Sequence, residues 1–555
     1  MNKILITAAL PYANGPLHFG HIAGAYLPAD AYCRFERLLG KDVLFICGSD
    51  EYGIAITLNA EKAQQSYQNY VDYYHHLHKE FFKKLNINFD HFSRTTNPYH
   101  KECVENFYND LKKNGYICEK ETQQLFCEKE NRFLADRYVE GTCPQCSYNY
   151  ARGDECQNCG ASYEATDLIN PHSKVSGESL IRKVTVHDFL LLPLFKDRLL
   201  DYFKIHPLRD NVKNFVKTYI DNLKPRAISR DLNWGIPVPN KPKGKVLYVW
   251  FDAPIGYISA TKEWAEKVVK DSFAWEKYWL DSSTRYVQFI GKDNILFHAV
   301  VFPAMELGQN ISYKMVDQLV VNEFLQLEGK QFSKSDGIYV DLDKFLNVFS
   351  VDQIRYVLAA NAPEVADSEF TWEDFQKRCN SELVGKFGNF VNRVVSFALK
   401  NEFVEISCPE NLDVEDIDFL SQVIEISIKA QEHYANFSLR KAVSCILELS
   451  QLGNVYLNNQ APWLVIKNEE KRSLVYKTLF CSLFCQKVLA LISYPIMPET
   501  ALKIFSILGI NIKADNIEGI WREDFFLYVQ DSFKLEKVKL LFSLVEDKDI
   551  AKFVN

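Results

Sequence analysis

The first fifty residues alternate between short apolar runs and one helical stretch. The runs KILIT (residues 3–7) and DVLFIC (residues 42–47) are rich in strand-favouring residues, and HIAGAYLPADAYCRFERLLG lies between them, ending at Gly40. A helix that ends at glycine between two apolar strands is typical of a βαβ unit, whose strands run parallel. The pattern therefore predicts an α/β fold with a Rossmann-like, doubly wound parallel sheet.

This pattern stops near residue 116 and returns near residue 236. Cysteines, glycines and charged residues cluster between these points, and VLYVWFDAPIGY and YVQFIGKDN then resume the apolar runs. We therefore expect strands on both sides of an insertion to complete one sheet. Beyond about residue 375 the apolar spacing becomes helical, as at Leu439, Ala442, Val443 and Ile446. The predicted parts are 1–115 (first half of the sheet domain), 116–235 (insertion), 236–320 (second half), 321–373 (a glycine- and lysine-rich loop region) and 374–555 (an α-helical bundle).

Charge and cysteine usage restrict the surroundings in which such a chain works. The net charge is −8, so a nucleic-acid partner would need a local basic surface. No run of 18 apolar residues occurs, and we expect no membrane-spanning helix. The 14 cysteines lie mostly in apolar surroundings, which is typical of reduced thiols. We expect a cytoplasmic protein.

The stretch ALPYANGPLHFGH, which follows the first predicted strand, has the properties of a phosphate site. Gly20 lies between His18 and His21, and a glycine lets a ligand approach the backbone closely. The free N–H groups at the start of a helix attract phosphate, and imidazoles can donate hydrogen bonds to it. The alternative is a turn that carries two surface histidines.

The segment EGKQFSKSDG, residues 328–337, is a second candidate phosphate loop. Lys334 can bring a point charge onto phosphate, and Ser333 and Ser335 can add hydrogen bonds. The alternative is a solvated polar loop, which most segments of this kind are.

Four cysteines in the insertion predict a metal site. They form two C-x₂-C pairs, Cys143 with Cys146 and Cys156 with Cys159. Four thiolates at this spacing can bind one zinc ion tetrahedrally, and they leave no position open for a substrate. We therefore expect one structural zinc; a redox pair is the alternative.

Together these motifs resemble those of the methionyl-tRNA synthetases, a family of class I aminoacyl-tRNA synthetases. ALPYANGPLHFGH, GSDEYG, WFDAPIGY, GKDNILFH and FSKS occur in that family's order, from Lys3 to at least Trp463. HFGH is similar to the HIGH signature of the class and QFSKS to its KMSKS signature, although Gln331 stands at the first KMSKS position.

The resemblance implies a ligase that joins L-methionine to tRNA(Met), initiator and elongator, through a methionyl-adenylate. It implies ATP with Mg²⁺, one zinc, an anticodon-binding helical bundle, and a monomer, because the chain lacks room for the C-terminal dimerisation domain of some relatives.

The resemblance also assigns roles to individual residues. Catalysis would use His18, His21 and Lys334. ATP would contact the same three residues and also Gly20, Gly291, Asp293, Ser333 and Ser335. Methionine would meet Leu10, Tyr12, Asp50, Trp250, Ala253, Pro254, Tyr257 and His298. The tRNA anticodon would meet Asn389, Arg393 and Trp463.

Three other interpretations explain part of the sequence. A synthetase for isoleucine, valine or leucine would carry a much longer insertion with an editing site. A small adenylyltransferase would explain the histidine motif but neither the cysteine pairs nor the helical part. A non-catalytic tRNA-binding protein would be expected to have lost HFGH and FSKS, and both are present.

Overall fold

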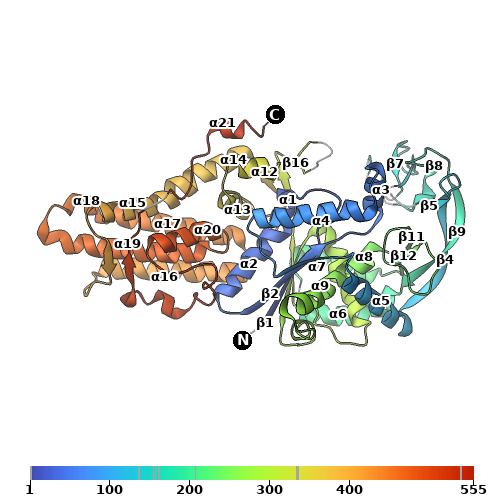
Figure 1. Cartoon of the computed structure of the whole chain (residues 1–555), viewed down its shortest axis with the longest axis horizontal. Coiled ribbons are helices and arrows are strands. Elements are labelled where there is room, and N and C mark those ends of the chain that lie inside the picture. Colours follow the sequence, from blue (N-terminus) through green and yellow to red (C-terminus); the bar gives the residue numbers. More distant parts are fainter. Residues whose placement is uncertain are drawn as a thin grey trace.

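A parallel sheet forms the middle of the molecule, with the insertion at one end and the helical bundle at the other (Figure 1). The structure, a computed structural model, describes residues 3–134, 138–153, 156, 158–159, 163–206, 208–332, 337–537 and 540–554.

The central sheet has five strands, and all neighbouring strands are parallel. Their order is β14-β13-β1-β2-β3. The strands are β1 (Lys3–Ala8), β2 (Asp42–Ser49), β3 (His91–Arg94), β13 (Arg285–Gly291) and β14 (Gln318–Asn322). Because the chain moves outward from β1 first in one direction and then in the other, a crevice is expected at the carboxyl end of β1 and β13. The sheet confirms the expected doubly wound fold, built from strands on both sides of the insertion.

Both faces of this sheet are buried. Ile4 and Ile6 belong to one hydrophobic cluster, whereas Leu5 belongs to another on the opposite face. The first cluster includes α2 (Leu27–Leu38), and the second includes α5 (Pro98–Lys113) and α9 (Gly256–Trp264). Burial on both faces explains why the strands read as continuous apolar runs in the sequence.

The insertion carries its own small sheets. The larger sheet has the order β10-β9-β4-β5, and a second one has the order β7-β6-β8. The strands are β4 (Ile117–Cys127), β5 (Arg132–Leu134), β6 (Val139–Thr142), β7 (Ala151–Arg152), β8 (Ile169–Ser173), β9 (Ile181–Leu190) and β10 (Arg226–Ala227). The exact limits of the insertion, like the other domain boundaries, stay a prediction.

The C-terminal part is a bundle of helices. Its long helices are α15 (Asn389–Lys400), α16 (Val414–Ala435), α17 (Leu439–Gln460), α19 (Arg472–Ser493) and α20 (Pro498–Ile507). The helix from Glu469 to Ser493 is apolar and long enough to cross a membrane, but 89% of its apolar window is buried inside the protein. It is the central helix of the bundle. After α20 the chain returns to the start of α14 (Trp372–Lys377), where Phe553 stacks on Trp372 at 4.9 Å.

A buried arginine joins the bundle to the sheet domain. Arg355 lies on α13 (Val351–Ala360) and is 1% exposed. It donates to the carboxylate of Asp30 on α2 at 2.7 Å and to four backbone carbonyls. Those carbonyls belong to Leu85, Asn86, Pro495 and Ile496. Arg34 donates to the same carboxylate at 2.8 Å. Burial alone would raise the pKa of Asp30, but the two guanidinium groups lower it, so the carboxylate stays charged.

Replacing Arg355 should destabilise the protein strongly. In Arg355→Leu, Asp30 loses one of its two guanidinium partners and the carbonyls of Leu85, Pro495 and Ile496 lose the arginine donor, which should cost about 3–5 kcal/mol. Thermal unfolding followed by circular dichroism measures the loss. Lys429→Ala, which removes an exposed ion pair with Glu425, is the control and should leave the midpoint unchanged. Equal midpoints for both variants would contradict the role given to Arg355.

Candidate active site

The loop after β1 is held against the carboxyl end of β2. The N–H of Ala13 donates to the carbonyl of Asp50 at 2.7 Å, and the N–H of Asp50 donates to the carbonyl of Pro11 at 2.9 Å. The ring of His78 donates to the carbonyl of Gly15 at 2.8 Å. These bonds place the histidine turn at the edge of the sheet where the crevice is expected.

The two histidines of the turn lie face to face. The ring centroids of His18 and His21 are 3.6 Å apart, and Phe332 stacks on the other side of His18 at 4.6 Å. A Cβ atom on Gly20 would lie 3.0 Å from the His18 ring and 3.1 Å from Phe332. Glycine is therefore needed here because two stacked rings occupy the space of a side chain. Sequence reasoning missed Phe332, although it directly precedes the serines and lysine of the second motif.

Both histidines are neutral in the free protein. Burial lowers the pKa of His18 to about 4. Although His21 is exposed, the protein atoms around it lower its pKa well below the ordinary value, and His18 and His78 lower it further. The N–H of His18 donates to Nδ1 of His21 at 3.2 Å, so the ring proton of His21 lies on Nε2. That N–H is a donor suited to a phosphate oxygen.

Other residues predicted to contact the nucleotide lie at the end of β13, the strand beside β1. Gly291 ends β13, and Asp293 follows it as an exposed side chain. A Cβ atom on Gly291 would lie 2.9 Å from the Asp293 carboxylate, so this glycine permits the close turn. Ser333, Lys334 and Ser335 lie outside the described residues, and their contacts stay a prediction.

A buried tyrosine–histidine pair lies in the predicted methionine pocket. Nδ1 of His298 donates to the carbonyl of Asn294 at 3.0 Å, so Nε2 carries the lone pair and accepts from the Tyr257 hydroxyl at 2.8 Å. Burial lowers the pKa of His298 to about 4, which keeps the ring neutral. Both polar side chains are thus satisfied, and an apolar ligand would meet their ring faces.

A half-buried stack of flat side chains lies beside this pair. Trp250 stacks on Phe297 with a centroid distance of 3.8 Å, and the Arg226 guanidinium lies 5.0 Å from the Phe297 centroid. Phe297 and Arg226 were not predicted, although Phe297 directly precedes the predicted His298. Trp250 is half buried, whereas Tyr257 is 1% exposed, as a core residue would be.

Two glycines make room for the remaining pocket residues. A Cβ on Gly256 would lie 3.0 Å from the Leu10 side chain, and one on Gly53 would lie 2.8 Å from the Tyr12 hydroxyl. Ala253 and Pro254 are buried between Trp250 and Tyr257 in the chain, and Asp50 is 8% exposed. All eight residues predicted for methionine lie among the described residues. Their role in binding stays a prediction.

The four cysteines of the insertion come together as expected. One Sγ atom from each lies within 4.8 Å of the others. Backbone N–H groups of Gln145 and Cys146 point at the Cys143 sulfur at 3.4 and 3.5 Å. The Asn158 side chain and the backbone N–H of Tyr148 lower the pKa of Cys146 to about 6, which favours the thiolate that binds metals. The cluster can hold one metal ion with no open position.

The three predicted anticodon residues share one face of the bundle. Asn389 and Arg393 are one helical turn apart on α15, and the Arg393 guanidinium lies 5.3 Å from the Trp463 ring centroid. Arg393 also donates to Asn458 at 2.8 Å. Trp463 is 41% exposed, so it is not a core residue.

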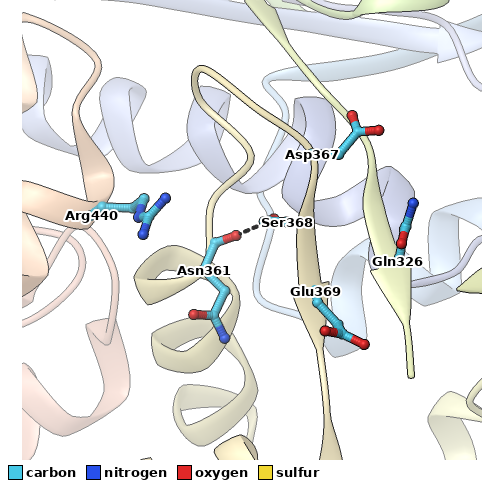
Figure 2. Close-up of a pocket in the computed structure, with 6 residues that line it drawn as sticks. All are labelled: Gln326, Asn361, Asp367, Ser368, Glu369 and Arg440. Carbon is cyan, nitrogen blue, oxygen red and sulfur yellow. Dashed lines mark hydrogen bonds between the residues drawn. The ribbon is translucent and has the colours of Figure 1, made fainter. Parts of the chain in front are cut away.

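The polar pocket shown in Figure 2 is separate from these groups. It has a volume of about 450 Å³ and lies where β15 (Leu325–Leu327) and β17 (Ser368–Phe370) face Arg440 of the bundle. Its lining contains none of the residues predicted for catalysis or binding. Asp367 is already paired with Lys292, and Ser368 donates to the Asn361 carbonyl at 2.6 Å. We assign it no role.

The sheet order, the histidine turn and the similarity to known proteins define the class. Residues 4–395 match the model of the class I tRNA synthetases of the methionine type, and residues 413–555 match that of the anticodon-binding domain of methionyl-tRNA ligase. The fold and the site thus identify a class I aminoacyl-tRNA synthetase.

Relatives identify the family. The chain is 57% identical to the methionine–tRNA ligase of Chlamydia trachomatis serovar A, over 98% of this chain and all of that protein. It is 54% identical to that of Protochlamydia amoebophila, over 99% of this chain and 78% of that protein. The solved Mycobacterium tuberculosis methionyl-tRNA synthetase in complex with methionyl-adenylate aligns with a TM-score of 0.80 at 25% identity, over 98% of this chain and all of that one. The chain belongs to the methionyl-tRNA synthetase family.

The metal cluster generates one prediction. Cys146→Ser should reduce the metal content of the dialysed protein to near zero, because a three-thiolate site binds zinc far more weakly than a closed site of four. Mass spectrometry of the digested protein measures the metal. The control is Cys127→Ser, another cysteine of the insertion that lies outside the cluster and should retain the metal. Metal loss in both variants, or in neither, would contradict the assignment.

Proposed function

We propose that the protein ligates L-methionine to tRNA(Met) in two steps at the crevice beside β1. In the first, an oxygen of the methionine carboxylate attacks the α-phosphorus of ATP, and pyrophosphate leaves. In the second, a hydroxyl of the terminal tRNA ribose attacks the carbonyl of the adenylate, and AMP leaves. The juxtaposition of a neutral histidine pair with an aromatic pocket carries the proposal.

The histidines act as donors in the first step. Charge grows on the bridging oxygen between the α- and β-phosphates as that bond breaks, and preorganised donors stabilise it. His21 offers its Nε2–H as a donor, and the His18 ring stacks on the His21 ring in the same turn. Lys334 supplies the cation, and Mg²⁺ neutralises the phosphates of ATP. Gly291 and Asp293 hold the nucleotide at the end of β13.

The pocket suits a thioether. The flat faces of Trp250 and Tyr257 offer polarisable contacts to sulfur, and the satisfied Tyr257–His298 pair presents no unpaired polar atom to an apolar chain.

Zinc is the metal proposed for the four cysteines, because tetrahedral thiolate sites favour it. We also propose a monomer that works in the cytoplasm, where cysteines outside the metal cluster stay reduced.

Adenylation tests the proposal directly. Methionine-dependent ATP–pyrophosphate exchange should occur without tRNA, and isoleucine, valine and leucine should not support it. His21→Ala should lower the exchange rate about 10²–10³-fold while methionine binding persists, because one donor to the developing charge is lost. His76→Ala, an exposed histidine of α4 (Tyr67–Lys84), is the control and should exchange normally. Unchanged exchange in His21→Ala would refute the role of the turn.

The exposed face of the bundle reads the anticodon of both initiator and elongator tRNA(Met). An exposed indole and a guanidinium beside it are typical of surfaces that stack and hydrogen-bond unstacked RNA bases. Arg393 and Trp463 form such a pair at 5.3 Å, and Asn389 adds an exposed amide on the same helix face.

Trp463→Ala should separate RNA recognition from adenylation. Loss of one base stack costs about 1–3 kcal/mol, so charging should fall roughly ten- to a hundredfold. Exchange and the thermal midpoint should stay unchanged, because Trp463 is exposed and exchange needs no tRNA. Leu464→Ala, its 77% exposed neighbour, should charge normally. Equal charging of tRNAs with normal and altered anticodons would defeat the assignment.

A further inference from the structure

A fully buried glutamate follows the predicted methionine contact Asp50. Glu51 lies in the stretch GSDEYG, between the end of β2 and α3 (Ile54–Lys62), and its side chain is 0% exposed. Asp50 forms a parallel bridge with Tyr12, so the chain is extended here and the side chains of residues 50 and 51 point to opposite sides. Sequence reasoning missed Glu51, because a second acidic residue in a loop reads as a solvated one.

Three side chains donate hydrogen bonds to the Glu51 carboxylate. The Ser49 hydroxyl donates to Oε1 at 2.6 Å, the Arg94 guanidinium donates to Oε2 at 2.8 Å, and the Thr96 hydroxyl also donates to Oε2. Because Ser49 uses its hydrogen on Glu51, it accepts from Nδ1 of His75 on α4 at 2.6 Å. Both oxygens of the carboxylate are therefore held, by residues from β2, from β3 and from the segment after β3.

The backbone of Glu51 is held as well as its side chain. Its N–H donates to the Thr95 hydroxyl at 2.9 Å, and its carbonyl accepts from the indole N–H of Trp234 at 2.7 Å. Trp234 belongs to the segment that joins β11 (Ser229–Asp231) to β12 (Lys245–Leu247). Each polar atom of Glu51 thus has a partner, and these partners come from distant parts of the chain.

Asp50 is fixed in place but keeps one carboxyl oxygen free. Its N–H and its carbonyl are bonded to the loop after β1, at Pro11 and Ala13. Its Oδ1 is buried and has no hydrogen-bond partner among the described residues. An unpaired buried oxygen is costly, so this atom is suited to a donor that a ligand brings. The ammonium group of methionine is such a donor.

Stability alone is a poor explanation of the contacts around Glu51. A buried ion pair adds little net stability, because the removal of two charges from water offsets their attraction. A carboxylate with three donors does supply a fixed position, and a displacement of about 1 Å in a group that positions a substrate can lower the rate about 10²-fold. The position of the neighbouring residue is therefore the property that Glu51 controls.

We propose that Glu51 is a positioning residue for methionine: it holds Asp50 so that the Asp50 carboxylate meets the ammonium group of the amino acid. Glu51 itself does not touch the substrate, because its side chain is fully buried among residues of β2 and β3. The inference deepens the proposed function and rests on it. Since the effect passes through the ammonium group, a ligand without that group should not respond to a change of Glu51.

Calorimetric titration with two ligands tests this. L-Methionine carries the ammonium group, and 4-(methylthio)butanoate is the same molecule without it. In Glu51→Gln one acceptor oxygen becomes an N–H₂ group that faces other donors, so Asp50 shifts and the affinity for L-methionine should fall about tenfold or more. The affinity for 4-(methylthio)butanoate should stay unchanged. L-Methioninol, which keeps the ammonium group and lacks the carboxylate, should lose affinity by the same factor as L-methionine.

Glu263 provides the matched control. It is 7% exposed and accepts from His91 at 2.9 Å, from Ser93 at 2.6 Å and from Lys267 at 2.7 Å, so it is a buried carboxylate bonded to β3 as Glu51 is. Glu263→Gln should lower the thermal midpoint, as Glu51→Gln does, but it should leave the affinities for both ligands unchanged.

Two further variants keep the test independent of the folding of Glu51→Gln. Thr96→Val removes one donor to Glu51 without a change of shape, and it should weaken L-methionine selectively by a smaller factor. Thr96→Ser retains the hydroxyl and should restore the affinity. The double variant Asp50→Asn with Glu51→Gln should bind L-methionine no more weakly than Asp50→Asn alone, because both changes act on one contact.

Four results would overturn the inference. They are an unchanged affinity of Glu51→Gln for L-methionine, equal losses for L-methionine and 4-(methylthio)butanoate, losses that add in the double variant, and the same selective loss in Glu263→Gln. Absence of methionine binding and of exchange in the wild-type protein is a different result, because it would overturn the proposed function and this inference with it.

Discussion

The ion pair between Arg355 and Asp30 determines how the two halves of the molecule meet. The Asp30 carboxylate is 2% exposed and could not stay charged without both guanidinium groups. The Arg355 guanidinium is 1% exposed and could not stay buried without its five acceptors. Asp30 lies on the helical run that begins at His18–Gly20, whereas Pro495 and Ile496 link the two last long helices of the bundle. Together with the apolar contacts of Phe35 with Tyr434 and Trp521, this buried side chain holds the bundle against the helical run that begins at the histidine turn.

The histidine turn of the candidate site is uncharged in the free protein. His18 and His21 are neutral because the protein around them disfavours the imidazolium. Each ring can therefore act as a neutral hydrogen-bond donor. Preorganised dipoles that need no reorganisation are the usual source of electrostatic catalysis.

Short sequence patterns predicted the strands of the sheet and the cysteine cluster. Apolar runs predicted the strands, because both faces of a parallel sheet are buried, and C-x₂-C spacing predicted the cysteine cluster, because a knuckle is a short loop. Contacts between distant residues were not predictable. The Tyr257–His298 hydrogen bond joins residues 41 apart. Arg355 lies in DQIRYVL, where nothing in the sequence distinguishes it from an exposed helix residue. The protonation states also needed the structure, because only three-dimensional burial sets them.

The insertion also delays completion of the sheet while the chain is being synthesised. β1 pairs with β2 soon after synthesis, but its other neighbour is β13, and the contact between Thr7 and Tyr286 spans 279 residues. At ribosomal rates of about 5–20 residues per second, one edge of β1 waits roughly 14–56 s for its partner. During that interval an apolar strand edge is open to wrong pairing, and such non-local closure is slow in itself. Early folding of the insertion, or a chaperone, would lower this risk by shielding that edge until the second half emerges.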